Sequence, residues 1–251
     1  MRPDDHVHGS RLPVIGDGRE VAVDAAVRSF DTTMIPLLHD LTGATVLVFG
    51  GGPVGARKTR RFAREAEVIV VSPDFADERF GDADLVRAAP EPGDVGDWLE
   101  RCEPALVVAA TDDDAINEAV ARAAQERGVL VNRADRSGER DPGSVVVPAT
   151  VREDPVAVSI ATGGTAPALS KHLRREFEEQ LSGAGEMARV CAALRTELRS
   201  RNVDPIRRRE LVGDVVKSPD VWTDLRTGAS KPSQVIEDVL SEERATERDL
   251  P

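Results

Sequence analysis

The chain has 251 residues, a formal net charge of −12 at pH 7, 31% charged residues and only 3% aromatic residues. Its length suffices for one large domain or two small ones. The charge argues against a nucleic-acid-binding protein, which would present a basic face. Few aromatics, no Tyr and many carboxylates indicate a salt-adapted (halophilic) cytoplasm; an ordinary acidic protein from a GC-rich genome is the alternative.

The two cysteines and the hydropathy of the chain indicate the cellular compartment. Cys102 and Cys191 are far apart and give neither a disulfide framework nor a metal-binding spacing. No apolar run approaches the roughly 18 residues that a membrane span needs, and no signal-peptide pattern opens the chain. We therefore expect a cytoplasmic protein with no membrane partner and no nucleic-acid partner.

Residues 1–33 are polar and contain several Gly and Pro residues, so we expect a poorly structured N-terminal extension. Within it, Glu20 to Val27 alternates weakly, as a strand or a short helix would.

Apolar strands and helices alternate from Thr45 onward. Continuous apolar strands of this kind are typical of a parallel sheet covered on both faces. The sequence therefore predicts an α/β fold with a Rossmann-type, NAD-binding domain over residues 34–143. Its expected elements are strands at Thr45–Phe49, Glu67–Ser72, Asp84–Ala88, Ala105–Ala110 and Val129–Asn132, and helices at Ala56–Glu65, Asp94–Arg101 and Asp114–Arg127.

The alternation breaks after this domain. Over residues 144–182 we expect two strands, Ser144–Thr150 and Val156–Ala161, and then a helix from about Ala168 to Leu181. These elements are too few to bury a core alone, which predicts a small α+β dimerisation region and hence a homodimer. Residues 183–251 read as a helical C-terminal region. Its expected helices are Glu186–Ser200, Pro205–Val216, Asp220–Leu225 and Pro232–Arg244.

The segment Gly50-Gly51-Gly52-Pro53-Val54-Gly55 satisfies G-x-G-x-x-G between a buried strand and a helix, the context that dinucleotide binding requires. Gly50 permits the tight turn, Gly52 lets the backbone approach a pyrophosphate, and Gly55 lets helix and strand pack closely. The helix N-terminus offers unpaired amides to phosphate. A glycine-rich turn without a ligand is the alternative.

Three further sites follow predicted strands. Asp74, after Pro73, is the candidate for a carboxylate that binds the ribose diol and favours NAD over NADP; it is otherwise a loop aspartate. Thr111 to Asp114 opens a helix, so one aspartate is expected to cap it while Thr111 and Asp112 face the ligand crevice. A divalent-metal site there lacks His and Cys, and we predict none. Asp135 leaves the last strand, either beside a bound nicotinamide or as a solvated loop residue.

These motifs together resemble the precorrin-2 dehydrogenase family, which includes the N-terminal module of siroheme synthase. The resemblance covers about Met34 to Ser200, and it rests on the order of the motifs rather than on any single one. The matching segments are Ile35-Pro36-Leu37, Val46–Lys58 (VLVFGGGPVGARK), Ala109–Asn117 (AATDDDAIN), Asn132–Asp135, Ser144–Pro148 and Thr162–Pro167 (TGGTAP) followed by Leu169.

The resemblance implies a Rossmann domain, an interlocking dimerisation region and oxidation of precorrin-2 to sirohydrochlorin with NAD. Some members also insert ferrous iron to give siroheme. By the same resemblance Pro53 and Val54 match dinucleotide contacts in the glycine loop, Pro73 and Asp74 match those after the second strand, and Asp135 matches the catalytic aspartate. Thr162 stands where some relatives carry a phosphorylatable serine; the extension before Met34 has no counterpart.

A mechanism follows as a hypothesis: nicotinamide takes a hydride while Asp135 takes a proton. The tetrapyrrole substrate carries many carboxylates, so a local basic patch must override the net charge. Its candidates are Arg133 and Arg136 beside Asp135, and Lys171, His172, Arg174 and Arg175 on the helix after TGGTAP. The amides of Gly163 and Gly164, in the turn that Thr162 opens, would bind a carboxylate. Asn132 is expected to orient Asp135 or a propionate. Three alternatives stand beside this: an NAD-binding sensor without turnover, a dehydrogenase for another substrate, and a chelatase alone.

Overall fold

The computed structural model describes residues 35–136 and 143–248, so the expected N-terminal extension and its Glu20–Val27 alternation lie outside the described residues. By its internal contacts the chain divides into a unit of residues 1–37 and a unit of residues 38–251. The elements below belong to the second unit.

Five parallel strands form one sheet in the order β3-β2-β1-β4-β5, as the apolar runs predict. Chain order reverses between β1 and β4, so a topological switch point lies at the carboxyl ends of these two strands. The elements are β1 Thr45–Phe49, α2 Pro53–Phe62, β2 Glu67–Ser72, β3 Asp84–Arg87, α3 Val95–Cys102, β4 Leu106–Ala109, α4 Asp114–Arg127 and β5 Leu130–Arg133.

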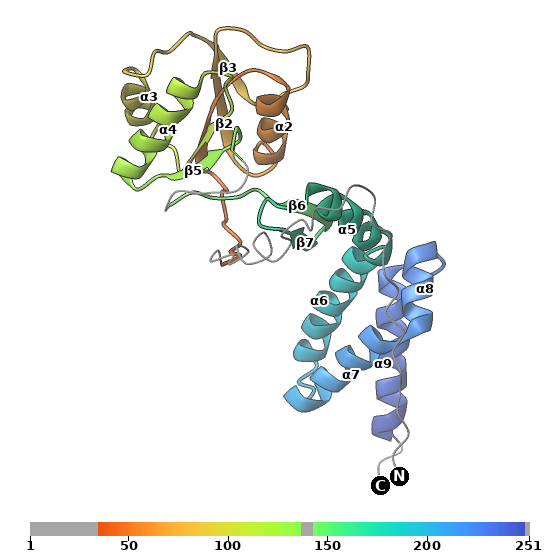
Figure 1. Ribbon diagram of the computed structural model, residues 1–251. Helices are drawn as coiled ribbons and strands as arrows, with labels where there is room; N and C mark the ends of the chain where they lie inside the picture. The colour runs from red at the N-terminus through yellow and green to blue at the C-terminus, as the bar shows by residue number, and fades with distance from the viewer. Residues whose placement is uncertain (1–34, 137–142, 249–251) are drawn as a thin grey trace, which may run out of the picture. The chain divides into compact units, whose positions relative to one another are not determined.

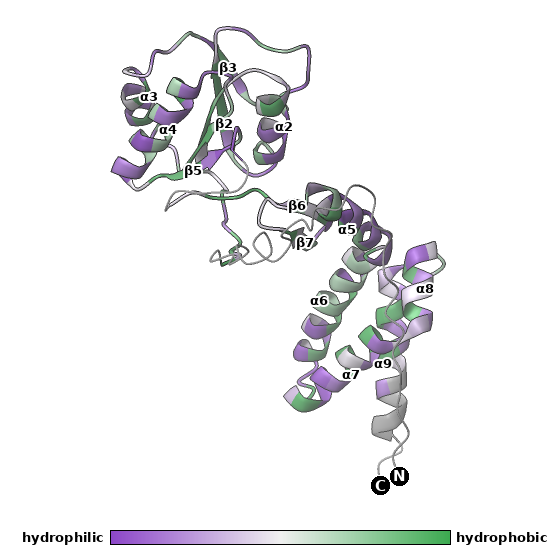
Figure 2. Cartoon of the chain, viewed as in Figure 1, coloured by the Kyte–Doolittle hydropathy of each residue, from purple (hydrophilic) through white to green (hydrophobic). Residues whose placement is uncertain are grey.

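Helices cover both faces of this sheet, α2 on one side and α3 with α4 on the other (Figure 1). Successive residues of β1 alternate between the two cores: Leu47 and Phe49 face α3 and α4, whereas Val46 and Val48 face α2. Figure 2 shows apolar strands between helices whose outer surfaces are polar. Double-sided burial explains why these strands read as continuous apolar runs.

The next element, the hairpin of β6 (Ala149–Glu153) and β7 (Val156–Ile160), corrects one sequence prediction. The strand expected at Ser144–Thr150 does not form there. Instead Ser144 makes one isolated bridge to Val131, and Val145 and Val147 pack against the α2-side core of the sheet. The apolar valines of this segment therefore cover the Rossmann sheet, and β6 extends to Glu153, beyond the predicted strand end at Thr150.

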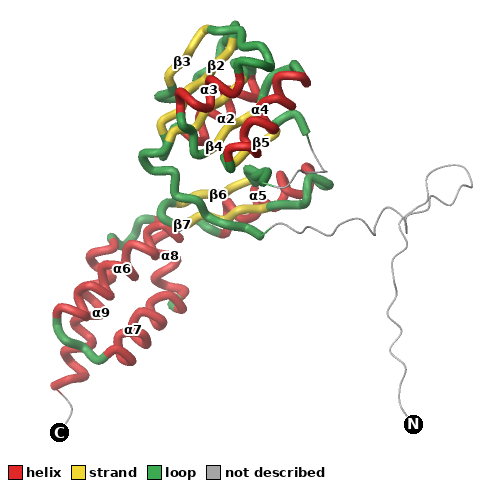
Figure 3. The backbone as a smooth tube through the Cα atoms, turned by 90° about the vertical axis from the view of Figure 1, so that its left-hand side faces the viewer, coloured by secondary structure: helices red, strands yellow, loops and turns green. Residues whose placement is uncertain are grey.

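Helix α5 (Pro167–Gln180) follows, close to the predicted bounds, and packs on the hairpin although none of its residues is buried. The predicted C-terminal helices are also confirmed, with boundaries shifted by up to four residues (Figure 3). A third core lies among them and includes Val190, Leu194 and Leu198. None of the helices among the described residues combines the length and apolarity of a membrane span. These helices are α6 Ala184–Ser200, α7 Pro205–Lys217, α8 Pro219–Thr227 and α9 Pro232–Arg248.

Candidate dinucleotide-binding site

In the glycine turn after β1, Gly50, Gly51 and Gly55 are packed closely against backbone atoms, whereas Gly52 is not. A Cβ added to Gly50, whose φ is +116°, would lie 2.3 Å from the carbonyl oxygen of Ala110 after β4. A Cβ on Gly55 would lie 1.9 Å from the oxygen of Gly50, so only glycine allows α2 to pack this closely. A Cβ on Gly52 would meet nothing within 4 Å. Packing within the protein therefore does not require glycine at position 52. The missing side chain instead leaves the backbone open to a ligand.

The N-terminus of α2 offers unsatisfied backbone donors beside Gly52. The helix starts at Pro53, its N-cap residue Gly52 makes no side-chain hydrogen bond, and its first turn holds no acidic residue. The first amides of a helix carry a partial positive charge and bind phosphate oxygens. Val54 is half-buried at this end, next to Gly55. This terminus fits the pyrophosphate of a dinucleotide.

Asp74 lies directly beside the glycine turn, as the spacing predicts. A Cβ on Gly51 would come within 2.3 Å of the Asp74 carbonyl oxygen, which shows a role for Gly51 that the motif alone does not reveal. The Asp74 side chain is 86% exposed and accepts a hydrogen bond from Arg87 Nη1 at 2.9 Å. The Arg87 guanidinium also lies over the Phe75 ring and donates to the Pro73 carbonyl. Arg87 holds the pKa of Asp74 below its usual range.

Arg87 is a site residue that sequence reasoning missed. It ends β3, and its register partner is Ser72 at the end of β2. The carboxyl ends of neighbouring parallel strands meet at one edge of the sheet, so the third strand's last residue was the available signal.

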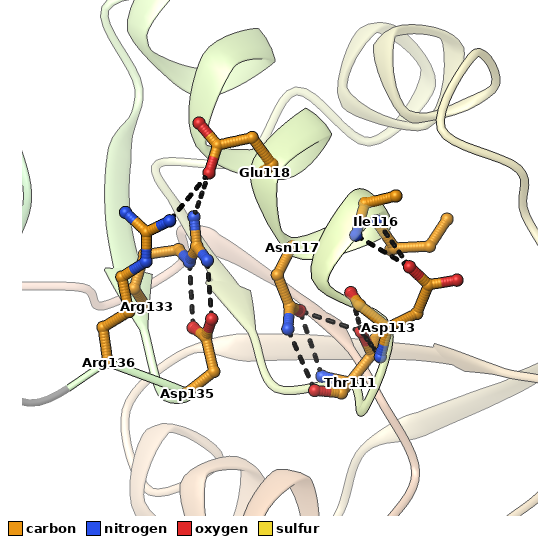
Figure 4. A network of polar contacts seen from close by, with 9 residues as sticks. Thr111, Asp113, Ile116, Asn117, Glu118, Arg133, Asp135 and Arg136 are labelled. Atoms are coloured by element: carbon orange, nitrogen blue, oxygen red, sulfur yellow. Dashed lines mark hydrogen bonds and ion pairs between the residues drawn. The ribbon is translucent and has the colours of Figure 1, made fainter.

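Thr111 and Asn117 form a clasp at the end of β4 (Figure 4). The Asn117 amide is fully buried; it donates to the Thr111 carbonyl at 2.9 Å and accepts from the Thr111 hydroxyl at 2.9 Å. Asp113 caps α4 by accepting from the amides of Ala115 and Ile116, whereas Asp112 is exposed. One aspartate thus caps the helix, and the clasp fixes the loop that follows β4 next to Gly50.

Asp135 follows β5 at the same edge of the sheet and is held by a bidentate ion pair. Arg133 Nε donates to its Oδ1 at 2.9 Å, and Arg133 Nη2 donates to its Oδ2 at 2.5 Å (Figure 4). Arg133 is only 6% exposed and also donates to Glu118 Oε2, which Arg136 contacts as well. Hydrogen bonds from Arg133 are the main cause of the lowered pKa of Asp135, and they lower the pKa of Glu118 too.

Asn132 and Arg133 are adjacent in β5 and point to opposite faces of the sheet, and it is Arg133 that holds Asp135. Its Nδ2 donates to the carbonyl of Val145 at 2.7 Å, on the α2 side of the sheet. Its Oδ1 is buried and has no hydrogen-bond partner. One of the two N–H donors of the Asn132 amide is used by Val145, and its role toward a substrate propionate stays a prediction.

Of the other predicted substrate residues, Thr162, Gly163 and Gly164 lie in the turn between β7 and α5, and Lys171 lies in the first half of α5. The Thr162 hydroxyl contacts the hydroxyl of Ser170 at 2.9 Å, and Gly163 and Gly164 both have positive φ angles. Lys171 is exposed. Among the described residues, no hydrogen bond or ion pair joins this turn to Asp135 or to the glycine loop. In the same ranges, no group of three or more His, Cys, Asp or Glu side chains is arranged to hold a metal ion.

Comparisons with known proteins agree with this geometry. Residues 37–149 match a family model described as putative NAD(P)-binding. A precorrin-2 dehydrogenase of Methanosarcina barkeri is 27% identical over 219 residues, which is 82% of this chain and 93% of that protein. A siroheme synthase of Pseudomonas putida is 35% identical over 194 residues, which is 74% of this chain and 40% of that protein.

A solved structure shares the fold. SirC, a precorrin-2 dehydrogenase, aligns with a TM-score of 0.62 at 22% identity and covers 83% of this chain and 100% of its own. The chain spans about 40% of the length of the siroheme synthases that it matches. It carries an NAD(P)-binding domain with a helical region after it, and its sequence is similar to precorrin-2 dehydrogenase and to part of the siroheme synthases.

Proposed function

We propose that this chain oxidises precorrin-2 to sirohydrochlorin with NAD, as a step of siroheme biosynthesis. The observation that carries the proposal is the shared edge of the sheet: the open glycine turn after β1 and the carboxylate of Asp135 after β5 both lie at the carboxyl ends of parallel strands. The relatives named precorrin-2 dehydrogenase and siroheme synthase supply the substrate class.

The residues present fit a bound dinucleotide. Gly52 leaves room for a close approach, and the first amides of α2 would hold the pyrophosphate. The Asp74 carboxylate, beside the turn, would accept hydrogen bonds from a ribose diol and repel a 2′-phosphate, which favours NAD. Pro53 and Val54 would contact the dinucleotide from the start of α2. Thr111 and Asp112 would line the crevice after β4.

Oxidation of the macrocycle removes a hydride and a proton. A bound nicotinamide supplies the hydride acceptor. Asp135 would accept the proton as general base, since its lowered pKa keeps the carboxylate ionised at neutral pH. Arg133 fixes both carboxylate oxygens and thereby orients the base. Arg133 and Arg136 balance the negative charges of Asp135 and Glu118, so this cluster adds no net repulsion toward a substrate bearing many carboxylates.

The test is an anaerobic assay with precorrin-2 and NAD, read by absorbance, on the full chain and on two variants. Asp135→Asn should keep NAD affinity within about twofold and reduce the oxidation rate at least about 100-fold, the usual contribution of a general base. Asp114→Asn, an exposed aspartate at the same edge, is the matched control and should retain activity. Persistent turnover in Asp135→Asn would remove the base assignment.

The same assay distinguishes the proposed function from the alternatives. A sensor without turnover and a dehydrogenase for another substrate would both bind NAD and leave precorrin-2 unchanged. Ferrous iron insertion is a second activity that the siroheme synthase relatives favour, with iron as a substrate. It is tested by adding ferrous iron to the reaction; siroheme should then form from sirohydrochlorin without NAD. A chelatase alone would form siroheme but fail to oxidise precorrin-2.

A homodimer formed through residues 144–182 is part of the proposal. The hairpin and α5 bury little: of their apolar residues only Val151 and Ile160 are buried, and Leu169 is 48% exposed. Leu169, Leu173 and Phe177 recur every fourth residue along α5 and form an apolar stripe. A second copy would cover this stripe. The turn at Thr162, Gly163 and Gly164 and Lys171 would then bind substrate carboxylates. A salt-rich cytoplasm as the setting remains a prediction from composition.

A further inference from the structure

A basic groove lies between α6 and α7, far along the chain from the dinucleotide-binding domain. Its volume is about 750 Å³, within the range of small-molecule sites. Its walls carry five cationic side chains, although the whole chain has a net charge of −12. These five are Arg195, Arg199, Arg208, Arg209 and Lys217.

None of these five cations has an ion-pair or hydrogen-bond partner among the described residues. Other arginines of these helices and their ends are paired: Arg189 with Glu186, Arg201 after α6 with Glu197, and Arg207 with Glu210 of α7. Acidic side chains are thus available on these helices, yet they neutralise the arginines outside the groove. Unpaired like charges repel one another, and an anion that entered the groove would offset that repulsion.

The lining of the groove includes a glycine, Gly213, that packing within the fold does not require. Gly213 lies in the interior of α7, where glycine costs about 1 kcal/mol relative to alanine. A Cβ at this position would meet nothing within 4 Å, and its φ is not in the positive range. No internal contact therefore explains the residue. The missing side chain at Gly213 leaves space for a bound molecule to approach the backbone of α7 closely.

The lining also indicates the shape of the ligand. Arg208 and Lys217 are nine residues apart on α7, which corresponds to about 13 Å along the helix axis. Apolar surface from Val212, Val216 and Pro205 lies between the charges. No aromatic side chain lines the groove, whereas single-stranded nucleic acids are bound by stacking on such side chains. Guanidinium groups bind carboxylates in a two-pronged geometry.

We propose that the α6–α7 groove binds an organic anion that carries several carboxylates, about a nanometre apart, on an apolar frame. The site is separate from the dinucleotide crevice, and the inference does not depend on the proposed oxidation. Polycarboxylated macrocycles belong to this ligand class.

The test is calorimetric titration of the full chain with uroporphyrin, an octacarboxylate porphyrin. Two variants address the groove in different ways. Arg199→Gln with Arg208→Gln removes charge from both helices and should weaken binding at least tenfold. Gly213→Leu keeps every charge and places a bulky side chain in the groove. Leucine is a good helix former, so the chain should fold normally but lose affinity for the porphyrin by a similar factor. Circular dichroism and thermal unfolding check the fold of both.

Arg201→Gln is the matched control. It also removes one positive charge, but from an arginine at the C-terminal end of α6 that is paired with Glu197. It should leave affinity within about twofold. If Arg201→Gln weakened porphyrin binding equally, or Gly213→Leu had no effect, the porphyrin would be attracted by the overall electrostatic field and not bound at a defined site. Either result would overturn the proposal. So would tighter binding of a single-stranded oligonucleotide or of tripolyphosphate than of the porphyrin. Because precorrin-2 oxidation is assayed separately, either proposal is able to fail alone.

Discussion

The carboxylate of Asp135 is bound through both oxygens by one guanidinium, so its proton affinity depends on a single neighbour. Arg133 in turn is buried between Asp135 and Glu118, and this keeps it charged and fixed. A base held in this way is well oriented but weakened, because the ion pair stabilises the ionised form. The balance between orientation and basicity at Asp135 is therefore set by Arg133.

We expect Arg133→Gln to raise the pKa of Asp135 toward its ordinary value. The acid limb of the kcat–pH profile for precorrin-2 oxidation should then move to higher pH, while Arg122→Gln on α4 should leave it in place. The folded-state pKa of Asp135 is depressed, so the pair stabilises the fold above the ordinary carboxyl pKa, and this contribution is lost as pH falls through the folded-state value. An unshifted acid limb would show that another group limits the rate.

Asp74 and Arg87 form the second pair with a predicted consequence. Replacing Asp74 by Asn removes the negative charge that repels a 2′-phosphate and that pairs with Arg87, so Arg87 is then able to bind the 2′-phosphate. We expect the ratio of NADP to NAD affinity to rise about tenfold, roughly the energy of one charged hydrogen bond. Fluorescence titration with both nucleotides measures it. Asp77→Asn, exposed in the same loop, is the control; an equal change there would refute a specific role for Asp74.

At the scale of elements, the turn between β1 and α2 separates two uses of glycine. Gly55→Ala places a Cβ 1.9 Å from the Gly50 oxygen, so we expect a lower thermal midpoint and loss of NAD binding together. Gly52→Ala meets nothing within 4 Å, so stability should change by less than about 0.5 kcal/mol, whereas NAD affinity should fall at least tenfold. Thermal unfolding and titration with NAD distinguish them; normal NAD binding by Gly52→Ala would contradict the predicted pyrophosphate position.

The elements also show where sequence patterns succeed. Strand β1 and helix α4 occur at their predicted bounds, because burial on both faces and the Asp113 cap with Gly128 at the other end are local signals. The strand expected at Ser144–Thr150 was wrong because its valines are apolar for a tertiary reason, namely packing on the α2-side core. Local apolar alternation does not reveal which surface it covers.

For the whole molecule, the sparse burial of the hairpin and α5 makes association with a second copy the main expectation. We predict that Leu169→Glu yields a monomer in light scattering, since it places a charge on the apolar stripe. Leu85→Glu is the matched control, because Leu85 is 46% exposed on β3 and Leu169 is 48% exposed on α5. If both variants kept the mass of the parent protein, the dimerisation region would lie elsewhere.

Sequence alone determined the layered α/β fold, the glycine turn, the candidate carboxylates and the family resemblance, because these follow from periodicity and from short motifs read along the chain. Only the tertiary structure decided which side chains meet: Arg87 with Asp74, Arg133 with Asp135 and Glu118, and Asn132 with the Val145 carbonyl instead of Asp135. These contacts join residues from different strands, or depend on which face of a strand a side chain points to. Such pairings arise from strand order and register, which a linear sequence does not specify.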